Sequence, residues 1–143
     1  MFNLNSAQSS APLNSERRSQ EASRHILVVE DDIDLCMLIQ QVVQGMDENV
    51  HVQFASTVHE AAMWLDGSPG FDLVLSDFLL ADSRSGYELR KICQERVPDA
   101  QFVMMSAMPL NLPDLAENEF LQKPFSPTEC AAFIEDAFEN ASA

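Results

Sequence analysis

Positive charge is scarce in this chain: 8 lysine and arginine residues stand against 23 aspartate and glutamate residues, and the formal net charge is −15 over 143 residues. A surface with this balance repels phosphate backbones and anionic lipids, so we expect neither nucleic acid nor a membrane as a direct partner. No apolar run is long enough for a signal peptide or a membrane span. We therefore predict a cytoplasmic protein.

Cysteine is also rare. Cys36, Cys93 and Cys130 lie far apart, their number is odd, and no CxxC pair occurs. Each falls among the apolar positions of a predicted helix, which favours buried free thiols over disulfides or a metal site. Such thiols suit a reducing compartment.

The chain divides into a tail and one domain. Residues 1–23 are rich in Ser, Asn, Gln and Ala and show little apolar periodicity, so we predict a flexible tail. Residues 24–143 carry a continuous apolar pattern without internal repeats, as expected of a single globular domain. No output domain is expected after Phe138, so any output should pass through protein contact.

Five short apolar runs alternate with helical patterns along this domain. The predicted strands are Ile26–Val29, Val50–Phe54, Phe71–Asp77, Gln101–Met105 and Glu119–Gln122. The last helix is predicted to start at a capping box formed by Ser126 and Glu129. The alternation implies right-handed crossovers and an α/β, flavodoxin-like, doubly wound five-stranded parallel sheet in the order 2-1-3-4-5.

The connection before the fifth strand is short. Residues 107–118 must leave the fourth strand, build a helix and return, and they include Pro109 and Pro113. At about 1.5 Å per residue only one or two helical turns fit. We therefore expect the helix between the fourth and fifth strands to be shortened or absent.

Chemically useful side chains stand where four of these strands end. Glu30 and Asp31 follow the first strand, Asp77 ends the third, Ser106 the fourth and Lys123 the fifth. In the predicted order these ends share one crevice. Two carboxylates ~5 Å apart at an effective dielectric of ~20 repel by roughly 3 kcal/mol, so three of them require a cation or a proton. Oxygen ligands favour Mg²⁺.

A metal held by few carboxylates keeps open positions that a phosphoryl oxygen can occupy. Lys123 would neutralise the other side of the same phosphate, and Ser106 would donate a hydrogen bond to a third oxygen. The set indicates phosphoryl transfer to a carboxylate, with Asp77 as the nucleophile.

Four motifs together resemble the receiver domain of two-component response regulators over about residues 24–140. They are Ile26-Leu27-Val28-Val29-Glu30-Asp31-Asp32, Leu75-Ser76-Asp77, Met105-Ser106-Ala107 and Lys123-Pro124-Phe125. The resemblance implies phosphorylation of Asp77 by a histidine kinase or histidine phosphotransfer protein, followed by contact with a downstream protein target. It implies self-phosphorylation and self-dephosphorylation only, and no enzyme activity on a separate substrate.

The resemblance also implies residue roles. Asp31 and Asp77 would bind Mg²⁺ directly, Glu30 would act through water, and the backbone carbonyl of Leu79 would complete the protein ligands. The roles of phosphate-binding lysine, switch hydroxyl and switch aromatic would fall to Lys123, Ser106 and Phe120. Leu79 and Met108 occupy the two positions that tune dephosphorylation; both are apolar, so slow loss of the phosphoryl group is expected.

Other interpretations remain open at this point. A degenerate receiver could act as a phosphorylation-independent protein-binding module. A haloacid dehalogenase-like phosphatase also uses a strand-end Asp, but it normally needs a second Asp where Leu79 stands. Asp31 and Asp32 could simply cap the first helix, and Phe120 could be an ordinary core residue. The Ser85–Gly86 pair is assigned to turn chemistry.

Overall fold

The computed structural model describes residues 23–67, 70–109 and 114–142. The predicted tail, residues 1–23, lies outside this part apart from its last residue. Five parallel strands form a sheet in the order β3-β2-β4-β5-β6. Their bounds are β2 Arg24–Val29, β3 Val50–Ala55, β4 Leu73–Asp77, β5 Gln101–Ser106 and β6 Phe120–Gln122. Counted along the chain this is the order 2-1-3-4-5, so the predicted flavodoxin-like fold is confirmed.

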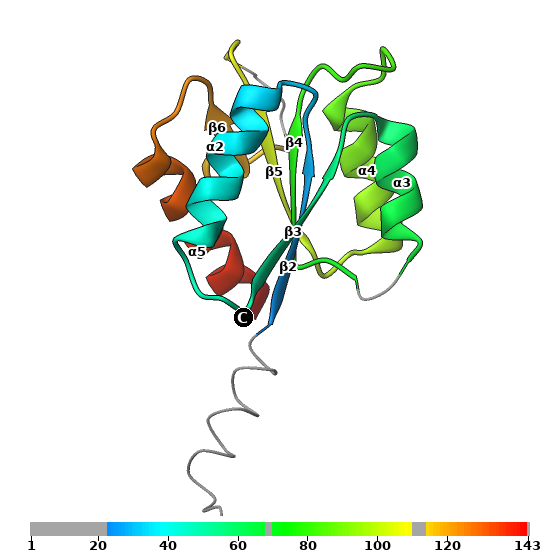
Figure 1. The fold of residues 1–143 in the computed structure, drawn as a ribbon. Helices are drawn as coiled ribbons and strands as arrows, with labels where there is room; N and C mark the ends of the chain where they lie inside the picture. Colours follow the sequence, from blue (N-terminus) through cyan, green and yellow to red (C-terminus); the bar gives the residue numbers. More distant parts are fainter. Residues whose placement is uncertain (1–22, 68–69, 110–113, 143) are drawn as a thin grey trace, which may run out of the picture.

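Two pairs of helices cover the two faces of the sheet (Figure 1). The helices are α2 Ile33–Gln44, α3 Val58–Leu65, α4 Gly86–Arg96 and α5 Pro127–Ser142. α2 packs with α5 on one face, and α3 packs with α4 on the other. The capping box predicted at Ser126 and Glu129 is present at the start of α5. In the described part of the chain, no helix is long and apolar enough to cross a membrane.

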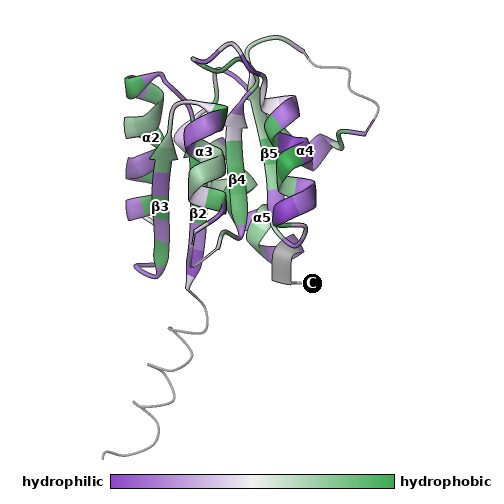
Figure 2. Ribbon diagram, turned by 90° about the vertical axis from the view of Figure 1, so that its right-hand side faces the viewer, coloured by the Kyte–Doolittle hydropathy of each residue, from purple (hydrophilic) through white to green (hydrophobic). Residues whose placement is uncertain are grey.

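The interior strand β2 is buried on both faces over Ile26–Val29, which explains its unbroken apolar run. Ile26 and Val28 pack against α2 and α5, while Leu27 and Val29 pack against α3 and α4. Successive strand residues point to opposite faces, so a strand between two helix layers needs an apolar residue at every position. Figure 2 shows that β4 likewise consists of hydrophobic residues over most of its length.

The start of α2 separates the roles of three consecutive acidic residues. The Asp32 side chain accepts hydrogen bonds from the backbone N–H groups of Asp34 and Leu35, so Asp32 is the helix cap. An acidic residue is favourable there because the helix dipole is positive at this end. Glu30 and Asp31 precede the cap and point toward the neighbouring strand ends.

The connection between β5 and β6 was expected to hold a shortened helix or none. The described part of this connection contains one short helical segment, the three-residue 3₁₀ helix η1, Glu117–Glu119, so a shortened helix is present. Residues 110–113 lie outside the described chain. Arg90 of α4, which is 5% exposed, donates to the Asp114 carboxylate at 2.8 Å and to the Asp114 carbonyl at 2.9 Å. Its Nη2 also lies 3.5 Å from Glu119, so a buried guanidinium fastens this connection to α4.

Candidate phosphoacceptor site

Three carboxylates meet at the carboxyl ends of β2 and β4. These strands are neighbours, with Val29 beside Ser76, so the residues that follow emerge at the same level. One oxygen from each of Glu30, Asp31 and Asp77 lies within 4.8 Å of the others. The side chains that the strand order was expected to bring together are therefore adjacent.

Lys123 reaches this group from the edge of the sheet. It follows β6, and its backbone N–H donates to the Ser106 carbonyl at 2.8 Å, which keeps it in register with β5. Its Nζ lies 2.7 Å from Glu30 Oε1 and 3.1 Å from Asp77 Oδ1. Glu30 and Lys123 are 93 positions apart in the sequence, so only the assembled sheet creates this contact.

Burial and charge compete at these groups. The Glu30 side chain is 1% exposed. Burial raises the pKa of Glu30. The nearby negative charge of Asp77 raises it further, whereas the hydrogen bonds from Lys123 and the Asp32 N–H lower it. Burial alone would lower the pKa of Lys123, but its contacts with Glu30 and Asp77 outweigh burial and raise it. One ammonium thus faces three carboxylates, and the cluster keeps an excess of negative charge.

The donor set fits a hard divalent cation. Glu30 uses one oxygen for Lys123 and the other for the Asp32 N–H at 3.1 Å, so it is placed behind the other two carboxylates. Asp31 is exposed and Asp77 half-buried, which leaves oxygens of both accessible. Mg²⁺ in proteins is held by one or two carboxylates and keeps several waters. Asp31 and Asp77 match that pattern, with Glu30 as an indirect partner.

Asp77 is held through its side chain and its backbone carbonyl. Phe78 N–H donates to Asp77 Oδ1, and Ser76 Oγ donates to the Asp77 carbonyl, both at 2.9 Å. Gly86, the first residue of α4, packs on that carbonyl: a Cβ there would overlap the oxygen and lie 2.7 Å from Met104 Sδ. The sequence pattern alone assigns Gly86 to turn chemistry, so its packing role beside Asp77 is missed. The sequence signal for that role is the glycine just inside a helix start, where glycine lowers helix propensity.

Gly86→Ala is expected to lower the free energy of unfolding by about 1–3 kcal/mol, the usual cost of overpacking a buried position. The added methyl group must displace the Asp77 carbonyl, so affinity for Mg²⁺ should fall too. Gly45→Ala is the matched control, because a Cβ there has its nearest contact at 3.5 Å, an ordinary distance. Thermal unfolding with and without Mg²⁺ measures both effects. Equal melting temperatures for the two variants would remove the role given to Gly86.

The loop after Asp77 holds Leu79 by its backbone. Leu79 forms an isolated antiparallel bridge with Ser85, and Gly86 N–H donates to the Phe78 carbonyl at 2.7 Å. The Leu79 side chain is 63% exposed and has no polar atom. Any contribution of this residue to a metal site must therefore come from its carbonyl, as the family resemblance implies.

Ser106 and Phe120 lie on β5 and β6 beside the site. Met105 pairs with Asp77, so Ser106 follows directly at the same edge. Ser106 is 4% exposed, and its hydroxyl accepts a hydrogen bond from Met108 N–H at 3.1 Å. Phe120 is half-buried, pairs with Met104 and packs against the core on the α3 and α4 face.

Comparison with known families agrees with this geometry. The sequence model of the response regulator receiver domain matches residues 26–135, so the chain belongs to that family. Its members are phosphoacceptor domains of two-component signalling. The matched range includes Glu30, Asp31, Asp77, Ser106 and Lys123. A search of curated proteins finds no match.

Solved structures of receiver proteins are similar in fold. A CheY-like receiver domain protein from Methanospirillum hungatei is 20% identical, with a TM-score of 0.69 over 83% of this chain and 96% of that one. A putative response regulator from Chloroflexus aurantiacus is 22% identical, with a TM-score of 0.68 over 81% and 98%. The response regulator PhyR from Brucella abortus is 28% identical, with a TM-score of 0.64 over 94% of this chain and 58% of that protein.

Proposed function

We propose that Asp77 accepts a phosphoryl group from the phosphohistidine of a histidine kinase or a histidine phosphotransfer protein. A carboxylate oxygen of Asp77 forms a bond to phosphorus while the phosphorus–nitrogen bond of the donor breaks. The imidazole leaves and takes up a proton, and Asp77 carries an acyl phosphate. The reaction modifies the chain itself, so we do not propose an enzyme acting on a separate substrate.

The contact of Lys123 with both Glu30 and Asp77 is the observation that carries this proposal. Lys123 lies 3.1 Å from the attacking carboxylate, where its charge can stabilise the equatorial oxygens of the transferred group. Asp31 and Asp77, with the Leu79 carbonyl, would hold Mg²⁺, which when bound neutralises the acidic cluster and offers a position to a phosphoryl oxygen. A degenerate receiver has no need to keep this full set.

We further propose that output passes through contact with a downstream protein. Phosphorylation adds about −1.5 to −2 charges at Asp77. The Ser106 hydroxyl would turn from Met108 to the new phosphoryl oxygens, and Phe120 would move into the space released, which changes the surface near β6. All three cysteines are free, which supports a reducing compartment, and we place the protein in the cytoplasm.

Incubation with acetyl phosphate separates the proposed function from its rivals. The chain should gain the mass of one phosphoryl group with Mg²⁺ present and none after chelation by EDTA. A phosphorylation-independent binding module would gain none in either case. A haloacid dehalogenase-like phosphatase would instead turn over p-nitrophenyl phosphate. Intact-protein mass spectrometry and release of p-nitrophenol distinguish the outcomes, and a chain that gains no mass with Mg²⁺ contradicts the proposal.

Leu79→Asn is expected to shorten the lifetime of the acyl phosphate on the order of tenfold, less than the roughly 100-fold that a general base supplies. The exposed Leu79 side chain cannot orient an attacking water, whereas an amide can. Met63→Asn is the control, because Met63 is 64% exposed on α3, away from the site. Loss of the phosphoryl mass is followed over time after acetyl phosphate is removed. A wild-type lifetime of seconds or less would contradict the expectation.

A further inference from the structure

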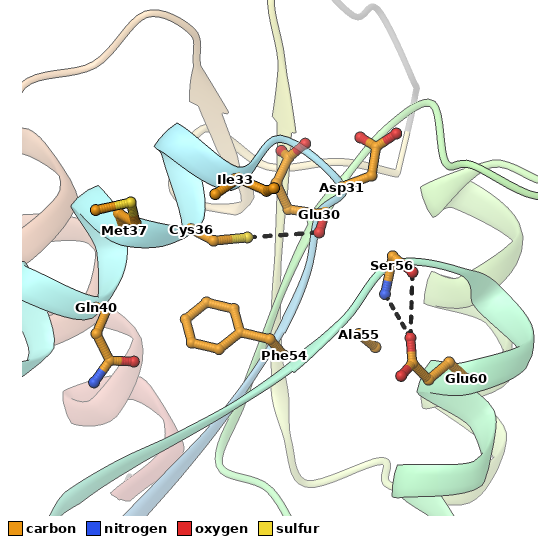
Figure 3. Close-up of a pocket in the computed structure, with 10 residues that line it drawn as sticks. All are labelled: Glu30, Asp31, Ile33, Cys36, Met37, Gln40, Phe54, Ala55, Ser56 and Glu60. Atoms are coloured by element: carbon orange, nitrogen blue, oxygen red, sulfur yellow. Dashed lines mark hydrogen bonds between the residues drawn. The ribbon is translucent and has the colours of Figure 1, made fainter.

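A cavity of about 470 Å³ lies directly beside the candidate phosphoacceptor site. It is open to solvent and bordered by α2, the end of β3 and the first turn of α3 (Figure 3). Glu30 and Asp31 line its upper end, so it shares two residues with the acidic cluster. An occupant of this cavity therefore lies next to the acidic cluster that contains Asp77, and the part of the cavity beyond Glu30 and Asp31 has no role in the site described so far.

The floor and one wall of the cavity are apolar. Figure 3 shows the Phe54 ring at the centre of the floor, with Cys36 beside it and Ile33 and Met37 on the α2 side. Ile33 is 74% exposed and Met37 is 56% exposed. A half-buried aromatic ring between flexible apolar side chains is a surface on which a flat group can stack.

The opposite wall carries a carboxylate that is already held in place. Glu60 Oε1 accepts hydrogen bonds from the Ser56 backbone N–H at 2.8 Å and from Ser56 Oγ at 3.3 Å. Within the described residues the second oxygen of Glu60 has no hydrogen-bond partner. Gln40 adds a neutral amide, and the residues that line the cavity include no Lys, Arg or His. Lys123 pairs with Glu30, but no Lys or Arg of the described residues forms an ion pair with Asp31 or Glu60, so these two carboxylates leave negative charge on the cavity.

We propose that this cavity receives an arginine side chain of the phosphohistidine protein that phosphorylates Asp77. A guanidinium stacks on an aromatic face and donates to an open carboxylate oxygen, while its aliphatic stem covers apolar surface. Phe54, Glu60 and Met37 supply those three contacts. Attraction to a chain of net charge −15 acts in the same direction. This inference rests on the proposed function, because the donor is the partner that must lie over Asp77.

The test titrates the full chain, with Mg²⁺ present, with N-acetyl-arginine methylamide and follows backbone amides by NMR. Shifts should localise to the cavity, with Ile33, Phe54 and Glu60 among the largest. The citrulline analogue has the same shape without the charge, and it should bind at least several-fold more weakly. Glu60→Gln should weaken binding about tenfold, as expected for loss of one charge-assisted pair. Glu135→Gln, an equal charge change at an exposed position of α5, should leave it unchanged.

Shifts spread over the whole acidic surface, or equal binding of the arginine and citrulline probes, would overturn the cavity assignment. Transfer from a phosphohistidine protein then tests the partner: Glu60→Gln should slow it about tenfold through KM relative to Glu135→Gln. Equal transfer rates would overturn the partner assignment. Uptake from acetyl phosphate, measured on the wild-type sample, reports the proposed function separately, because a chain can bind the probe without taking up phosphate, or the reverse.

Discussion

Replacing Asp77 by Asn is expected to reduce phosphoryl uptake from acetyl phosphate below detection. The amide lacks the anionic oxygen that attacks phosphorus, and it removes one of the two accessible carboxylates that would hold Mg²⁺. The change is nearly isosteric, so the hydrogen bond from Phe78 N–H can be kept by the amide oxygen. Intact-protein mass spectrometry with Mg²⁺ present measures the effect directly.

Asp99→Asn is the matched control for this experiment. Asp99 is exposed and lies before β5, at the end of the sheet opposite to the acidic cluster. The same loss of one negative charge there should leave uptake unchanged. Wild-type levels of uptake in Asp77→Asn would show that another residue accepts the phosphoryl group, and the proposed chemistry would be wrong.

Lys123→Met is expected to cost about 3 kcal/mol of stability at neutral pH and to stop phosphoryl uptake. Lys123 is the ammonium that contacts Glu30, whose side chain is 1% exposed. Removing one partner of a buried pair leaves the other charge without compensation, which is far more costly than losing an exposed pair. Methionine keeps the volume of the aliphatic stem, so the effect reports charge. Chemical unfolding at constant salt measures the loss.

The chain supplies its own control, because Lys91 is its only other lysine. Lys91 is exposed on α4, and its Nζ lies 5.0 Å from the centre of the Tyr87 ring. Lys91→Met should cost about 0.5–1 kcal/mol, the value of an exposed cation–π contact. Similar losses in the two variants would mean that the pair of Lys123 with Glu30 is not specially stabilising.

The stability of Lys123→Met should also depend on pH in a characteristic way. The pKa of Glu30 is already raised by burial, and loss of Lys123 removes an interaction that lowers it. Between 4.5, the ordinary pKa of a glutamate, and the raised pKa of Glu30, the folded variant then binds more protons than the unfolded chain. Its stability therefore falls as the pH rises through the raised pKa of Glu30 and recovers as the pH falls toward 4.5. In the wild type, the contribution of Lys123 is present below 10.5 and lost above it, as the pH passes the raised pKa of this lysine.

The order of strands and the position of the site were accessible from the sequence. Unbroken apolar runs such as Ile26–Val29 reveal strands buried on both faces, and a parallel sheet places their carboxyl ends at one edge. That rule was enough to expect Glu30, Asp77 and Lys123 together. The bounds of the strands differ from those predicted by one or two residues, because strand ends depend on neighbours as well as on local pattern.

The details within the site were not accessible in this way. Asp31 and Asp32 carry the same side chain at consecutive positions, yet Asp31 faces Asp77 and Asp32 caps α2. The contact of Gly86 with the Asp77 carbonyl depends on how closely α4 approaches β4. No periodicity encodes such a distance, because it is set by packing between segments that are separated in the sequence.

The sequence by itself determined the class of fold, the edge of the sheet that carries the chemistry and the residue types gathered there. These follow from local periodicity and from the geometry common to all parallel sheets. Only the tertiary structure decided which oxygens of Glu30 are already occupied, how Arg90 fastens the connection before β6, and that Phe54 and Glu60 form a cavity beside Asp77. Those features depend on contacts between distant segments, whose distances arise when the helix layers close on the sheet.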